Sequence, residues 1–109
     1  MKWYKIFNSL EIATQKIPVN TAKLLLIGDR RICLAHTLEG FFAVSDTCTH
    51  LGESLSKGNL NYLNEVICPW HSYRFNLKTG EECERRCRAL ETYAIKLTND
   101  GLFIGLITQ

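Results

Sequence analysis

Cys48-Thr49-His50 and Cys68-Pro69-Trp70-His71 are the two stretches on which the interpretation of this chain depends, and residues 51–67 separate them. Each stretch follows a β-prone run and stands at the mouth of a loop. Gly52 in the first loop allows unusual backbone angles, and Pro69 in the second turns the chain without leaving an unpaired N–H. The sequence therefore predicts that two thiols and two imidazoles are presented on a pair of loops.

This donor set is compatible with two kinds of metal site. Tetrahedral zinc often takes two cysteines and two histidines, although zinc sequences usually pair cysteine with cysteine and histidine with histidine. Here cysteine and histidine alternate along the chain. Alternation is expected for a two-iron cluster in which one iron takes both cysteines and the other takes both histidines. The residues thus favour an iron–sulfur cluster and leave zinc as the alternative.

At these positions the chain resembles the Rieske family, whose motif is C-x-H, a spacer of about this length, and C-x-x-H. The resemblance implies one [2Fe–2S] cluster per chain. Cys48 and Cys68 would bind one iron as thiolates, and His50 and His71 would bind the other as neutral imidazoles. Further matching segments extend the resemblance over nearly the whole chain: Leu55-Ser56-x-Gly58, Val66-x-Cys68-Pro69-Trp70-His71, Phe75-Asn76-x-x-Thr79-Gly80, Leu90-x-x-Tyr93-x-Ile95 and Asp100-Gly101-Leu102-x-Ile104.

The resemblance also has implications for the reduction potential. High-potential members carry an extra cysteine in each loop and, after the second histidine, a Ser and a Tyr that donate hydrogen bonds to sulfur. This chain lacks the extra cysteines and has Tyr73 and Phe75 at the other two positions. We therefore expect a potential in the lower part of the Rieske range. Two departures are Ser72 and Tyr73, where relatives usually have one Gly, and Cys87, where many have Pro; we expect Ser72 to face solvent.

Short β-prone runs separated by turns predict an all-β fold. Asn99-Asp100-Gly101 and Gly28-Asp29-Arg30 each stand between two such runs and predict hairpins. Helical periodicity is weak, apart from one turn over Ser9–Thr14 with Asn8 or Ser9 as its cap. The expected strands are Trp3–Phe7, Lys23–Ile27, Arg31–His36, Phe41–Ser45, Glu65–Ile67, Tyr73–Leu77, Tyr93–Leu97 and Leu102–Leu106.

The 109 residues fit a single domain. The resemblance implies a Rieske fold, in which residues 1–45 and 78–109 form a small antiparallel sandwich or barrel base. A cluster-binding lobe over residues 46–77 would be inserted into this base.

Charge and hydropathy exclude several other classes of protein. The net charge is +2 without a basic run, which argues against nucleic acid and anionic membranes as partners. The longest apolar run, Leu24–Ile27, is too short to span a bilayer, and no signal peptide is visible. We therefore expect a cytoplasmic protein.

The function implied by the resemblance is single-electron transfer without bond chemistry. Rieske ferredoxins pass electrons from a flavin-dependent reductase to a terminal oxygenase, and docking is expected near His50 and His71. An oxygenase would need two more histidines and a carboxylate for a second iron, and only His36 remains. The alternatives are a Rieske-like small subunit of a larger reductase, such as nitrite reductase, and a zinc-bound structural or interaction module.

The remaining cysteines do not suggest a disulfide framework, because the total of five is odd and no secretory signal is present. Cys33 lies in an apolar run and is expected in the core. Cys83 and Cys87 are interpreted as two thiols on a loop, with a second metal or a redox switch as the alternative, and the charge run around them as a solvated face. Trp70 is either core or a partner contact, and Leu51 has the same two interpretations.

Overall fold

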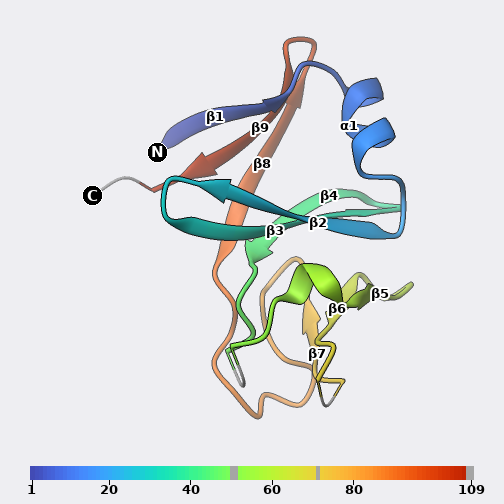
Figure 1. Cartoon of the computed structure of the whole chain (residues 1–109), viewed down its shortest axis with the longest axis vertical. Helices are drawn as coiled ribbons and strands as arrows, with labels where there is room; N and C mark the ends of the chain where they lie inside the picture. Colours follow the sequence, from blue (N-terminus) through green and yellow to red (C-terminus); the bar gives the residue numbers. More distant parts are fainter. Residues whose placement is uncertain (50–51, 71, 108–109) are drawn as a thin grey trace.

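The computed structural model describes residues 1–49, 52–70 and 72–107, and its described part is built almost entirely from antiparallel strands. Strands β1, β9, β8, β4, β3 and β2 follow one another in a larger sheet, and β5, β6 and β7 form a smaller one. Figure 1 shows the two sheets at opposite ends of the long axis. The elements are β1 (Lys2–Phe7), α1 (Leu10–Lys16), β2 (Thr21–Ile27), β3 (Arg30–Thr37), β4 (Gly40–Ser45), η1 (Leu55–Lys57), β5 (Asn59–Leu60), β6 (Glu65–Ile67), β7 (Arg74–Asn76), β8 (Thr92–Thr98) and β9 (Gly101–Leu106).

Local turn chemistry places the hairpins of the larger sheet. Strands β2 and β3 are joined at Gly28-Asp29, where Gly28 has a φ of 62°. Strands β8 and β9 are joined at Asn99-Asp100, with Thr98 paired to Gly101. Both predicted hairpins are confirmed. Glycine tolerates the positive φ that such turns need, so a glycine between two β-prone runs marks the turn in the sequence.

Helix α1 is longer than the single turn expected from the sequence. Ser9 caps it, accepting a hydrogen bond from the Ile12 N–H at 3.1 Å. Ala13 and Ile17 are fully buried on its inner side, so tertiary packing adds to the weak local preference. No helix of the described residues is long and apolar enough to cross a membrane.

Strand β3 separates two hydrophobic cores because alternate side chains point to opposite faces of a sheet. Ile32 and Leu34 belong to a core with Ala13 and Ile17. Cys33 and Ala35 face the other core, which extends to Cys48, Leu55, Val66, Cys68, Phe75, Leu77 and Leu90. The expectation that Cys33 is a core residue is confirmed, and the second core connects the larger sheet to both loops that carry predicted ligands.

His36 is a structural residue at the end of β3. Its side chain is buried, its Nδ1 lies 2.7 Å from the Ile17 carbonyl oxygen, and its ring stacks on Phe41 with 3.9 Å between centroids. It belongs to the larger sheet rather than to the loops that carry the predicted ligands.

The smaller sheet lies within a long excursion of the chain between β4 and β8. These two strands are paired neighbours, with Ala43 opposite Tyr93, and the Ser45 N–H donates to the Glu91 carbonyl oxygen at 2.8 Å. Strands β6 and β7 match the sequence prediction, whereas β5 and the short helix η1 were expected as loop. The excursion contains both the Cys-x-His and the Cys-x-x-His stretch.

Candidate metal centre

The loop after β4 is closed by backbone hydrogen bonds around Cys48. The Cys48 N–H donates to the Glu53 carbonyl oxygen, the Gly52 N–H donates to the Cys48 carbonyl oxygen, and Thr47 bridges to Ser54. Gly52 has a φ of 73°, which a residue with a Cβ adopts only at a cost. The closed loop turns the Cys48 side chain inward, where it is 1% exposed.

The loop between β6 and β7 is a tighter turn that presents Cys68. The Cys68 N–H donates to the Tyr73 carbonyl oxygen at 2.8 Å, so the two ends of the turn are joined. Ser72 is exposed, as expected, and has a φ of 56°. This left-handed conformation gives a physical reason for the Gly that relatives place here.

Cys48 and Cys68 come together as two buried free thiols in one core, each about 1% exposed. Burial raises the pKa of the Cys68 thiol to about 11, the Trp70 N–H lowers it, and the neighbouring Cys48 side chain raises it further. Two adjacent thiols shielded from water are soft donors that become thiolates when a cation compensates their charge. The cysteines therefore fit the sulfur side of an iron–sulfur cluster.

The predicted histidine ligands, His50 and His71, lie outside the described residues, as does Leu51. Within residues 1–49, 52–70 and 72–107 no three His, Cys, Asp or Glu side chains gather as a metal site. The described structure thus brings together the two cysteines of the predicted set. The full set of Cys48, His50, Cys68 and His71 stays a prediction.

Asp46 closes the base of the Cys48 loop and was not identified from the sequence. Its side chain is fully buried, with Oδ1 accepting from the Ser56 N–H at 2.7 Å and Oδ2 accepting from the Ser54 hydroxyl. Arg31 lies 3.7 Å from Oδ2. The charge of Asp46 also acts within the core. Burial raises the pKa of the Cys33 thiol to about 12, and the Asp46 carboxylate is the second cause of this rise.

Glu82 shows that the expectation of a solvated charge run over residues 81–88 is wrong at one position. Its side chain is fully buried beside β7, and Phe75 and Glu82 form a β-bridge. Arg86 binds both carboxylate oxygens through Nε at 3.0 Å and Nη2 at 2.8 Å, and its guanidinium stacks 3.7 Å from the Tyr73 ring centroid. Hydrogen bonds from Arg86 hold the pKa of Glu82 well below its ordinary value, although burial opposes them.

Cys83 and Cys87 are two free thiols on this same segment, in line with the favoured interpretation. Cys83 is exposed and donates to a Glu82 carboxylate oxygen at 3.2 Å. Cys87 is half-buried, and the Thr49 hydroxyl donates to its sulfur at 3.4 Å. The segment therefore contacts the first loop through Thr49 and the second through Tyr73.

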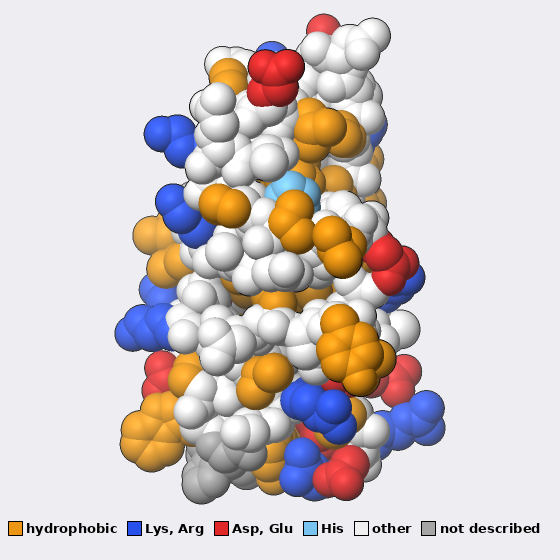
Figure 2. Space-filling view, turned by 90° about the vertical axis from the view of Figure 1, so that its right-hand side faces the viewer, with side chains coloured by type: hydrophobic (Ala, Val, Ile, Leu, Met, Phe, Trp, Pro, Cys, Tyr) orange, Lys and Arg blue, Asp and Glu red, His pale blue; other side chains and the backbone are white. Residues whose placement is uncertain are grey.

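Surface features distinguish the end with the smaller sheet from the rest of the molecule. Trp70, directly before His71, is 59% exposed, which favours the partner-contact interpretation over the core. Figure 2 shows charged side chains of both signs lying together toward the end with the smaller sheet, where Arg85 pairs with Glu81 at 2.9 Å. This end combines an exposed aromatic side chain with mixed charge.

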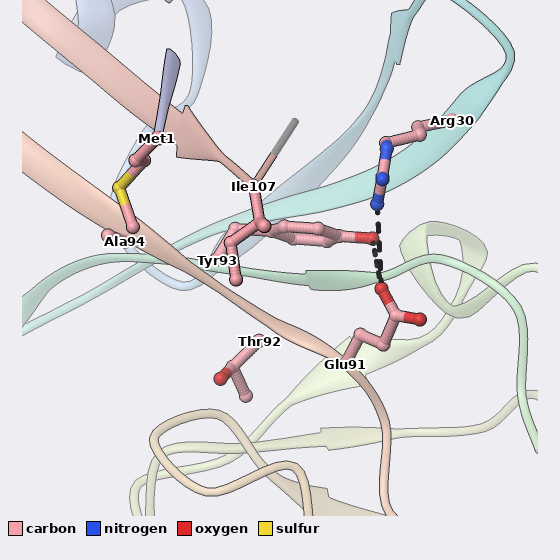
Figure 3. Close-up of a pocket in the computed structure, with 8 residues that line it drawn as sticks. Met1, Arg30, Glu91, Thr92, Tyr93, Ala94 and Ile107 are labelled. Carbon is pink, nitrogen blue, oxygen red and sulfur yellow. Dashed lines mark hydrogen bonds and ion pairs between the residues drawn. The ribbon is translucent and has the colours of Figure 1, made fainter. Parts of the chain in front are cut away.

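A separate cavity of about 380 Å³ lies at the edge of the larger sheet. Figure 3 shows Tyr93 and Arg30 converging on Glu91, with the Tyr93 hydroxyl 3.2 Å and the Arg30 guanidinium 3.6 Å from its carboxylate. Among the described residues, neither Cys48 nor Cys68 lines it. By contrast, Cys48 borders a hollow of about 670 Å³ together with Thr47, Thr49, Gly52 and Arg88.

Comparison with known proteins agrees with this arrangement. Residues 2–94 match the family described as Rieske [2Fe-2S] domain, so the chain belongs to the Rieske [2Fe–2S] domain family. The family implies a [2Fe–2S] cluster, which the two buried cysteines fit.

Similar sequences include named ferredoxin subunits. The 3-phenylpropionate/cinnamic acid dioxygenase ferredoxin subunit of Photorhabdus laumondii is 36% identical over 74 residues, which are 67% of this chain and 70% of the relative. The protein of the same name from Escherichia coli (strain K12) is 37% identical over 67 residues, 61% of this chain and 63% of the relative. The alignments therefore span about two thirds of these relatives.

Similar structures confirm the all-β Rieske-type fold. The ferredoxin of carbazole 1,9a-dioxygenase from Nocardioides aromaticivorans IC177 superposes with a TM-score of 0.81 at 16% identity, covering 95% of this chain and 97% of that one. A protein described as an NADH-dependent nitrite reductase small subunit from Mycobacterium tuberculosis gives 0.82 at 16% identity, covering 99% and 97%. At these identities the likeness concerns the fold alone.

Proposed function

We propose that this chain is a Rieske-type ferredoxin that carries single electrons and holds one [2Fe–2S] cluster on Cys48, His50, Cys68 and His71. The observation that carries the proposal is the meeting of two buried free thiols, Cys48 and Cys68, from two separate loops. Membership of the Rieske family and the ferredoxin subunits among the relatives support it. When bound, the cluster accepts one electron and gives it back without bond chemistry on a substrate.

The chain's own residues would divide the work of holding the cluster within the lobe over residues 46–77. Cys48 and Cys68 lie on the inner side, shielded from water, and supply the anionic ligands. The two histidines would supply neutral ligands, which raise the potential above that of ferredoxins with cysteine ligands only. An imidazole edge near the surface would then be the exit for the electron.

The proposed partners are a flavin-dependent reductase as donor and a terminal oxygenase as acceptor, docking near His50 and His71. The exposed Trp70 supports this face, because aromatic side chains are enriched among residues that dominate binding energy. A ferredoxin of this fold has been solved in complex with the oxygenase of carbazole 1,9a-dioxygenase, which supports an oxygenase as the acceptor. The cytoplasmic location stays a prediction.

A small subunit of a larger reductase is the second candidate, because nitrite reductase small subunits are among the similar structures. The similar structures do not separate the two, because ferredoxins and nitrite reductase small subunits both stand at 16–23% identity. The curated relatives at 36–37% identity are ferredoxin subunits. We therefore give the ferredoxin function precedence. Turnover with a flavin reductase and an oxygenase, compared with co-purification with a reductase large subunit, separates the two.

The first test is the absorption and EPR spectrum of protein purified without air, before and after dithionite. We expect a red-brown protein with a rhombic signal of Rieske type on reduction, and two iron and two sulfide per chain. Cys48→Ser should lose the signal, whereas the matched control Cys83→Ser, at an exposed thiol, should keep it. A colourless wild-type protein with bound zinc, even after iron–sulfur reconstitution, would contradict the proposal and favour the zinc-bound module.

A further inference from the structure

Asp46 is a fully buried carboxylate two residues before Cys48, and the electron-carrier function does not by itself explain it. We propose that Asp46 is a positioning residue that fixes the Cys48 loop, and that its negative charge lowers the reduction potential of the centre. The inference rests on the proposed cluster site. It assigns part of the potential to a residue that is not itself a ligand.

Hydrogen bonds from Asp46 across the loop support its role as a positioning residue. Asp46 binds the Ser54 hydroxyl and the Ser56 N–H with its side chain, and its carbonyl oxygen accepts from the Leu55 N–H at 2.7 Å. Three successive residues beyond the loop are therefore tied to one residue before it. A loop closed in this way cannot move Cys48 without breaking several hydrogen bonds at once.

The negative charge of Asp46 is only partly compensated by its surroundings. Asp46 forms an ion pair with the Arg31 guanidinium, 3.7 Å from Oδ2. The Arg31 side chain is 50% exposed, whereas that of Asp46 is 0% exposed, so solvent screens the cation more than the anion. A net negative field should remain inside the core.

Asp46 is close enough to Cys48 for its electric field to act on the proposed cluster. Asp46 and Cys48 are two residues apart, which places their Cα atoms no more than about 7 Å from each other. Reduction adds one negative charge, so a nearby carboxylate disfavours the reduced state and lowers the potential. At an effective protein dielectric we expect a change on the order of tenfold in the equilibrium constant for reduction, equivalent to about 59 mV for one electron.

The test compares three variants by EPR-monitored redox titration of protein loaded with its cluster. Asp46→Asn keeps a side chain of the same shape and removes the charge. The midpoint potential should therefore rise by about 59 mV, which corresponds to a tenfold change in the equilibrium constant for reduction. Arg31→Gln removes the compensating cation and should shift the potential in the opposite direction. Ser54→Ala leaves the charge in place, so it should speed cluster loss to a chelator while shifting the potential much less than Asp46→Asn.

Opposite shifts in Asp46→Asn and Arg31→Gln would support the proposal, since a loosened loop alone has no reason to reverse sign. If both variants bind the cluster at the wild-type potential, the proposal is overturned while the ferredoxin function stands. If Asp46→Asn does not retain the cluster, Arg31→Gln decides: a lower potential supports the proposal and an unchanged one overturns it. A wild-type protein without any cluster would instead contradict the proposed function itself.

Discussion

Two residues in the ligand loops reach similar backbone conformations by different means. Gly52, with a φ of 73°, is free of the Cβ that makes this region costly. Ser72 adopts a φ of 56° with a side chain in place, at a cost of roughly 1–2 kcal/mol. The hydrogen bond that closes the turn from Cys68 to Tyr73 offsets this cost.

At the proposed ligand His71, replacement by cysteine tests the ligand assignment. His71→Cys should keep a cluster with a lower potential, because a neutral ligand becomes anionic. Redox titration followed by EPR measures the shift. His36→Gln, in the other core, is the control and should leave the potential unchanged; an unchanged or raised potential in His71→Cys would refute the assignment.

Glu82 should make stability depend on pH in the acid range. Its carboxyl has a lowered pKa in the folded state, so its contribution is present above the unfolded value of about 4.3 and is lost as pH falls below it. Glu82→Gln should lower the free energy of unfolding at pH 7 by about 1.5–3 kcal/mol and flatten its decline in acid.

Denaturant unfolding from pH 7 to pH 3 measures this effect. The matched control is Glu81→Gln, which breaks an exposed ion pair with Arg85 and should change stability little. Equal effects of the two substitutions at every pH would show that the burial of Glu82 against Arg86 has no effect on the free energy of unfolding.

Among the elements, η1 and β6 approach each other so closely that Gly58 has no room for a side chain. A Cβ at Gly58 would lie 1.9 Å from the Ile67 carbonyl oxygen, which is backbone and cannot rotate away. Gly58 follows η1, and Ile67 directly precedes Cys68. Steric pressure at this contact should therefore be transmitted to the second ligand loop.

Gly58→Ala should destabilise the protein by at least about 2–3 kcal/mol and reduce its iron content. Gly28→Ala is the matched control. A Cβ there meets nothing within 4 Å, so only the left-handed backbone, at about 1–2 kcal/mol, opposes it. Thermal unfolding and iron analysis distinguish the two, and full iron content in Gly58→Ala would contradict the proposed transmission.

The longer elements were predictable from sequence because their signals are local. Turn residues between β-prone runs predicted the hairpins around Gly28 and Asp100. Strand β5 has only two residues, and its pairing with β6 exists only in the folded chain. The Cys-x-His and Cys-x-x-His spacing likewise indicated the cysteines. Asp46 and Glu82 look like surface charges in the sequence, because the packing that buries them exists only in the folded chain.

On the scale of the whole molecule, stability is expected to be uneven. The larger sheet has strands of six to eight residues around its own core. The smaller sheet has strands of two or three residues and shares a core with the two thiols proposed to bind the cluster. Short strands hold few hydrogen bonds, so this end should depend most on the bound group.

Removal of the cluster should therefore loosen one end of the molecule selectively. Amides of β5, β6 and β7 should exchange much faster in the protein without its cluster, whereas those of β3, β4 and β9 should change little. Hydrogen exchange followed by mass spectrometry compares the two forms. Uniform acceleration over both sheets would indicate that the molecule unfolds as one unit.

The pairing of β4 with β8 brings together the two points where the smaller-sheet end joins the larger sheet. Because these strands are neighbours in the larger sheet, the chain departs and returns across a gap of about one strand spacing, roughly 4.8 Å. An insertion whose two ends meet so closely can vary in length at little cost to the sheet that carries it. The same scaffold can therefore accept a different excursion between residues 45 and 91 if the new segment again covers Cys33, Ala35 and Val44, which makes this junction the natural place to transplant another redox centre.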